Sequence, residues 1–151
     1  MQRIRQLLVL GALFCLMFVA AITLAQPRST ALGSTVFDWN ALTEKPTKTG
    51  STRALFQAPT ALLDELECHV TTLRPGLDPH PPHQHVEEEL YVIKEGTVDI
   101  LIGGEHKQVG AGSVIFAAVN QPHGIRNAGT TPATYHVIKW KNQGAASTQV
   151  K

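Results

Sequence analysis

Residues 76–96 read GLDPHPPHQHVEEELYVIKEG and hold three of the seven histidines, His80, His83 and His85, ahead of three consecutive glutamates. Residues two apart on a β-strand project to the same face, about 6 to 7 Å apart along the chain, so His83 and His85 can reach one metal ion. A carboxylate a few residues later, after a turn, can supply a third ligand. Imidazole nitrogens and carboxylate oxygens suit divalent Zn, Fe, Mn, Ni and Cu. This stretch alone leaves open whether the histidines form a metal site or a solvated, charged hairpin.

A further histidine provides a fourth candidate ligand. His123 follows the turn at Gln121 and Pro122 and opens a predicted strand, on which Asn127 lies four residues later on the same face. A histidine carried by a turn is well placed to complete a coordination sphere that begins on a neighbouring hairpin.

The rest of the domain has the pattern of an all-β protein. Short segments rich in β-branched and aromatic residues recur between turn signals, and helical periodicity is hard to find. The continuous apolar run VIFAAV, residues 114–119, predicts a buried strand. Strands at this regular spacing predict a sandwich or barrel with one core. The predicted strands are residues 35–39, 52–57, 66–73, 90–93, 97–102, 106–109, 114–119, 124–127 and 133–141.

The two histidine-containing stretches resemble the two sequence motifs of the cupin superfamily. The first motif is a glycine, an HxH pair, a glutamate a few residues later and a second glycine. The gap after the first glycine is one residue longer here than usual. In this chain the motif positions are Gly76, His83, His85, Glu89 and Gly96.

The second motif is matched in register by Gly112, His123 and Asn127. The positions that usually hold a proline and a glycine are Ala118 and Asn120, which we interpret as a changed turn ahead of His123. The spacer between the motifs has the short form typical of single-domain microbial cupins.

The resemblance implies an all-β fold over residues 35–142, a single jelly-roll β-barrel of the cupin-like double-stranded β-sandwich type. It also implies one divalent metal ion (Mn, Fe, Zn, Ni or Cu) inside the barrel. The register to Gly96 selects Glu89 over Glu87 and Glu88, which we interpret as solvated turn residues. The implied metal ligands are His83, His85, Glu89 and His123.

Cupins carry out many reactions, so the fold does not fix the function. The resemblance favours a metal-dependent enzyme on a small organic molecule, of the dioxygenase, decarboxylase, isomerase or aminohydrolase type. The alternatives are a non-catalytic module that binds a metal and a small ligand, and a protein that sequesters metal.

Catalytic candidates are weaker than the ligand set. A decarboxylase needs a proton donor near the open metal positions, and His80 or Glu67 can serve. His80 is equally consistent with a solvent-exposed loop histidine. Glu67 shares a strand face with His69, so both residues can line the interior or simply form part of its wall.

The N-terminal residues predict a signal peptide over residues 1–25. Two arginines and no acid precede an apolar run at residues 7–25, and Thr23 and Ala25 are small enough for a cleavage site. We therefore expect export by a Sec-type signal, a periplasmic or secreted protein, and no membrane association after cleavage. The alternative is an uncleaved membrane anchor. A linker, residues 26–34, and a polar tail, residues 143–151, would flank the domain.

The charge and cysteine content limits the partners. Without residues 1–25 the chain has 11 basic and 12 acidic residues, so nothing in its charge favours nucleic acid as a partner. Cys68 is then the single cysteine, and we interpret it as a buried small residue. A small-molecule ligand or substrate is the expected partner. The resemblance also implies a homodimer, in which residues 35–57 can pair along the edge of a neighbouring barrel.

Overall fold

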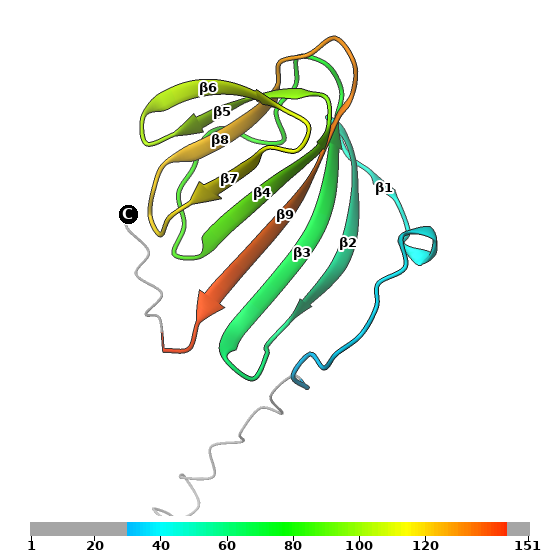
Figure 1. Ribbon diagram of the computed structural model, residues 1–151, viewed down its shortest axis with the longest axis vertical. Coiled ribbons are helices and arrows are strands. Elements are labelled where there is room, and N and C mark those ends of the chain that lie inside the picture. The colour runs from blue at the N-terminus through cyan, green and yellow to red at the C-terminus, as the bar shows by residue number, and fades with distance from the viewer. Residues whose placement is uncertain (1–29, 145–151) are drawn as a thin grey trace, which may run out of the picture.

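The computed structural model describes residues 30–144, which form two antiparallel β-sheets packed face to face (Figure 1). The predicted signal peptide, part of the linker and most of the tail lie outside the described residues. Within residues 30–144, no helix has the length and apolar character that a membrane span requires. The six-stranded sheet has, in spatial order, the strands β1 (Lys45–Pro46), β2 (Gly50–Ala58), β3 (Leu63–Leu73), β9 (Ala133–Asn142), β4 (Glu88–Glu95) and β7 (Val114–Ala117). The three-stranded sheet has the order β6 (Glu105–Gly110), β5 (Thr97–Ile102) and β8 (His123–Asn127).

The chain crosses repeatedly between the sheets, as in a jelly roll. It passes from β4 to the hairpin β5–β6, returns to β7, crosses to β8 and ends on β9 in the centre of the six-stranded sheet. The sequence predicts a closed barrel, and this is wrong in detail, because hydrogen bonding does not run continuously from one sheet to the other. Loops rather than strands span the corners, and only an isolated bridge between His83 and His123 extends the small sheet.

The core lies between the inner faces of the two sheets. Along β5 the side chains alternate, with Val98 and Ile100 buried. Residues of the six-stranded sheet meet them from the other side. The buried cluster comprises Leu73, Tyr91, Ile93, Val98, Ile100, Ile115, Ile125, Ala133, Tyr135 and Val137.

The predicted strand at residues 35–39 is wrong. The segment is irregular and leads into a short 3-10 helix, η1 (Trp39–Ala41), in which the Asn40 N–H donates to the Asp38 side chain. The segment is held against the six-stranded sheet by side-chain packing and not by backbone pairing with a neighbouring strand. Phe37 packs on Phe56 with ring centroids 4.9 Å apart, and the Trp39 ring lies 4.4 Å from Lys94 Nζ.

The apolar run at residues 114–119 is only half buried. Strand β7 ends at Ala117, and its burial alternates, with Ile115 and Ala117 inside and Val114 and Phe116 exposed. Because β7 is an edge strand whose outer face has no covering layer within the described residues, every second residue remains in solvent. The predicted strand therefore exists, but the prediction of continuous burial is wrong.

Cys68 is a buried free cysteine, as predicted. Burial raises the pKa of its thiol to about 11, and the negative charge of neighbouring Glu67 acts in the same direction. The thiol therefore stays protonated near neutral pH and is a poor nucleophile.

Asn127 fixes the turn after β8. Its fully buried amide nitrogen donates to the carbonyls of Leu73 and Thr131, both at 2.9 Å, and its oxygen accepts from the Gly129 N–H at 2.9 Å. Asn127→Ala leaves these buried groups without partners, so we expect a loss of about 3 kcal/mol in the free energy of unfolding, measured with urea. Gln108→Ala on exposed β6 is the control, with a change under about 0.5 kcal/mol. A loss at Asn127 no larger than the control would contradict this role.

Candidate metal centre

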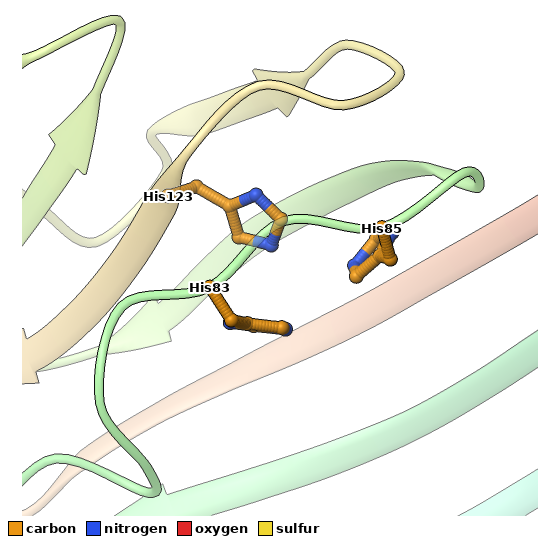
Figure 2. A group of neighbouring side chains, drawn as sticks. All are labelled: His83, His85 and His123. Carbon is orange, nitrogen blue, oxygen red and sulfur yellow. The ribbon is translucent and has the colours of Figure 1, made fainter. Parts of the chain in front are cut away.

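Three histidines converge from two parts of the chain (Figure 2). His83 and His85 lie in the loop before β4, and His123 is the first residue of β8. Reciprocal backbone hydrogen bonds of 2.9 Å join His83 and His123, and the Asn120 N–H donates to the His85 carbonyl at 2.8 Å. These bonds position the rings so that one nitrogen of each lies within 4.8 Å of the others. Nitrogen ligands at this mutual distance can hold one metal ion.

Glu89, on strand β4, is the fourth member of the group. Its Oε2 lies 3.1 Å from His85 Nε2 and 3.0 Å from His123 Nε2, and it accepts a hydrogen bond from the Tyr91 hydroxyl at 2.9 Å. Burial alone would raise the pKa of Glu89, but these three contacts outweigh it and hold the pKa well below the usual range. Glu89 is therefore a carboxylate at neutral pH, directed at the histidine nitrogens.

In two of the three histidine rings, Nδ1 already makes a hydrogen bond to a backbone carbonyl. His85 Nδ1 lies 3.0 Å from the Glu87 carbonyl, and His123 Nδ1 lies 2.8 Å from the Gln121 carbonyl. A carbonyl only accepts, so each hydrogen bond places a proton on Nδ1, and Nε2 is the nitrogen that faces Glu89. Metal-binding histidines commonly have this arrangement, because the second hydrogen bond fixes the tautomer and the ring orientation.

His123 Nε2 provides a direct test of whether the site fits a metal. The nitrogen is buried and has no hydrogen-bond partner among residues 30–144, since Glu89 Oε2 is close but lies outside hydrogen-bond geometry. Buried polar atoms without a partner are rare in folded proteins. A divalent cation between the imidazoles and Glu89 would satisfy this nitrogen, so the residues present fit a metal ion.

His83 completes the donor set as a neutral ring. Partial burial and the neighbouring histidines, His80 first among them, together lower its pKa to about 4, against the opposing effect of the negative charge of Glu89. At neutral pH the ring is uncharged, and a metal ion does not have to displace a proton from it.

The structure brings the four predicted ligands together, and their role as ligands stays a prediction. His80 lies beside the group, with its ring edge-on to His83 and the centroids 4.3 Å apart, and is exposed. Glu67 is outside the group, on β3. The interpretation of Glu88 as solvated is wrong, because its half-buried carboxylate accepts a hydrogen bond from the Trp140 indole at 2.8 Å.

At the motif position that usually holds a glycine, the turn ahead of His123 has Asn120. Asn120 has a φ of 57°, in the left-handed region that glycine adopts without strain. Asparagine is one of the few other residues that tolerates this conformation, so it can replace the usual glycine. The departure from the motif therefore does not displace His123.

Sequence reasoning missed the groups that orient the ligands. The carbonyls of Glu87 and Gln121 belong to no side-chain motif, and nothing in the sequence marks them. The sequence leaves open whether Tyr91 lies beside the metal or simply packs, and in the structure its hydroxyl donates a hydrogen bond to Glu89. The signal in the sequence that could have identified Tyr91 was its position two residues after Glu89 on one predicted strand.

Gly124 allows the histidine loop to approach β8. A Cβ on this residue would lie 3.1 to 3.3 Å from three atoms of Pro82, which directly precedes His83. We expect Gly124→Ala to displace the loop that carries His83 and to weaken zinc binding by about tenfold. Loss of a group that orients a metal ligand has an effect of this size. Gly110→Ala, where the nearest atom is 3.8 Å away, is the control. Equal zinc affinities in the two variants, measured by chelator competition, would contradict this positioning role.

The fold and the site define a class: a two-sheet jelly-roll domain with a three-histidine cluster. Residues 69–139 match the family model described as Cupin domain. The chain belongs to the cupin superfamily, as a small cupin with one domain in the described residues.

Solved structures of cupins have the same fold. A predicted oxalate decarboxylase from Thermotoga maritima is 20% identical with a TM-score of 0.59, over 71% of this chain and 99% of that chain. KdgF from Halomonas sp. is 14% identical with a TM-score of 0.61, over 74% and 97% of the two chains. The Cupin_2 domain of an XRE family transcriptional regulator from Enterobacter cloacae is 24% identical with a TM-score of 0.50, over 58% and 92%. At these identities the likeness concerns the fold alone. A search of curated proteins gives no significant match.

Proposed function

We propose that this protein is a metal-dependent cupin enzyme that acts on a small organic molecule. One divalent transition metal ion would be held by His83, His85, Glu89 and His123. The observation that carries the proposal is the buried Nε2 of His123, which has no hydrogen-bond partner in the described part of the chain and lies among the other ligand atoms.

Each residue has a defined part in this proposal. The three imidazoles supply nitrogen ligands, Glu89 supplies the negative charge, and Tyr91 holds its carboxylate in place. A metal bound here would polarise a carbonyl or carboxylate oxygen or bind dioxygen. Four protein ligands leave one or two positions open on an ion with five or six ligands.

The experiment that tests this is the metal content of protein purified without a metal-binding tag. We expect about one Zn, Fe, Mn, Ni or Cu per chain in the wild type and loss of that metal in His83→Ala. His106→Ala changes an exposed histidine on β6 and should retain the metal. Well-folded wild-type protein that takes up no metal, or metal retained equally by both variants, would overturn the proposal.

A non-catalytic module is the second candidate function. A cupin domain within a transcriptional regulator favours it, because such a domain is described as part of a regulator and not as an enzyme. Incubation of the metal-loaded protein with a bound ligand separates the two functions. An enzyme releases a changed molecule, whereas a binding module returns the ligand unchanged.

We also propose export and a homodimer. Support for export comes from the charged start and apolar run of residues 1–25, and mass spectrometry of the mature N-terminus tests it.

Support for the dimer comes from Val114 and Phe116, which are 60% and 49% exposed on the outer face of β7. Sedimentation that gives only monomer over a concentration series would remove the dimer.

A further inference from the structure

Three residues with ionisable side chains share the inner face of the six-stranded sheet with Glu89. Lys139 on β9 is directly opposite both Glu89 on β4 and Glu67 on β3. Directly opposed residues project to the same face, and in the next row His69 is opposite Val137, which lies in the core. Two strand spacings place Glu67 about 10 Å from Glu89. Glu67, His69 and Lys139 therefore lie on the same side of the sheet as the candidate metal ligand.

His69 and Glu67 form a close pair. His69 Nδ1 lies 2.6 Å from Glu67 Oε1, and both side chains are largely buried, with 31% and 14% of their surface exposed. The carboxylate favours the tautomer with the proton on Nδ1, so that Nε2 carries a lone pair. Within residues 30–144, Nε2 makes no hydrogen bond. A histidine oriented by a carboxylate, with its other nitrogen free, has the arrangement of a general base.

Lys139 places a positive charge between Glu67 and Glu89, in the same row of the sheet. Its residue is half-buried, and among the described residues no carboxylate oxygen lies within 4.0 Å of its ammonium group. Its positive charge is therefore not neutralised by a direct ion pair and can attract an anionic ligand. An anionic ligand is the partner that this position lacks.

We propose that the ligand of this site is a small carboxylate that also bears a carbonyl group, a 2-oxo acid. Lys139 binds its carboxylate, and the His69–Glu67 pair exchanges a proton with the carbon beside the carbonyl. The inference rests on the proposed metal function, which supplies the anchor for the rest of the molecule.

The proton transfer balances without a further reactant. His69 Nε2 takes a proton from the carbon next to the carbonyl, and the electron pair of the broken C–H bond forms the enolate double bond. The negative charge moves to the carbonyl oxygen. The imidazolium, stabilised by Glu67, then returns a proton to the same carbon, and nothing is oxidised or reduced.

Pyruvate binding tests the role of Lys139. Calorimetric titration of zinc-loaded protein should show pyruvate binding that weakens by about tenfold or more in Lys139→Met, because the charge that attracts the carboxylate is lost. Lys141→Met is the matched control, on the same strand and face but one row further from Glu89, opposite Glu65. Equal affinity in both variants would overturn the role of Lys139.

Hydrogen exchange tests the role of His69. The methyl protons of pyruvate in D2O, followed by NMR, should exchange faster with wild-type protein, and His69→Gln should lose about 100-fold of this rate. Pyruvate affinity and zinc content should stay close to the wild-type values. The control is His106→Gln, which removes a histidine paired with Asp99 at 2.8 Å on the exposed small sheet. Unchanged exchange in His69→Gln would overturn the general-base role.

Zinc content in the same samples separates this inference from the proposed function. Wild-type protein that holds zinc but neither binds pyruvate nor accelerates exchange would overturn the inference and leave the metal site in place. Folded wild-type protein that takes up neither zinc nor any other of the proposed metals would overturn both.

Discussion

Glu89→Gln is expected to weaken zinc binding by at least about 100-fold, measured by competition with a chelating indicator. Loss of a group that merely orients a ligand already costs about 10- to 100-fold in affinity, and Glu89 is a proposed ligand. The substitution removes the negative charge that lies 3.0 to 3.1 Å from the Nε2 atoms of His85 and His123. An amide is also a weaker metal ligand than a carboxylate.

Glu88→Gln makes the same chemical change one residue earlier. Because successive side chains of a strand alternate, Glu88 lies on the other face of β4, where it accepts from Trp140. Glutamine retains an oxygen that can accept this hydrogen bond, so we expect zinc affinity within about threefold of the wild type. Equal losses of zinc affinity in the two variants would contradict the assignment of Glu89 as the metal ligand.

Gly96→Ala is expected to lower the free energy of unfolding by about 2 to 5 kcal/mol, measured with urea on metal-free protein. Gly96 has a φ of 80°, a conformation that costs an L-residue about 1 to 2 kcal/mol. Its added Cβ would lie 2.7 Å from Ala133 Cα and 2.8 Å from the Pro132 carbonyl oxygen. Relief of such overpacking requires backbone shifts that cost about 1 to 3 kcal/mol more.

Gly112→Ala isolates the contribution of the clash. Gly112 has a φ of 83°, close to that of Gly96, but a Cβ there meets no atom within 4 Å. We expect only the conformational cost of about 1 to 2 kcal/mol. If both variants lose the same stability, the close approach of Gly96 to β9 does not matter energetically.

Much of the fold could be predicted because it depends on local patterns. The alternation of Val98 and Ile100 with polar neighbours identifies β5 and its buried face without any knowledge of its partners. Residues 35–39 show the limit of this reasoning. Their β-branched and aromatic residues suit a strand, but Phe37 and Trp39 pack onto the outer sheet face instead. Strand propensity measures fit to a half-buried surface, and such a surface also accepts an irregular segment.

The candidate site was predictable to a similar degree. The HxH spacing, Glu89 and His123 are readable from the sequence, because motif spacing reflects the short loops that bring them together. The orientation of the rings was not, since it depends on the carbonyls of Glu87 and Gln121. Backbone carbonyls are present at every residue, and only their three-dimensional position selects these two.

The sequence by itself therefore determined the all-β class, the turn glycines and the four residues proposed to bind a metal. The tertiary structure decided that the sheets stay open and that Lys139 lies opposite both Glu89 and Glu67. It also decided that His123 Nε2 is buried without a hydrogen-bond partner. The physical reason is that strand register and loop approach are set by pairing between distant segments. Local propensity and residue spacing describe only neighbours along the chain.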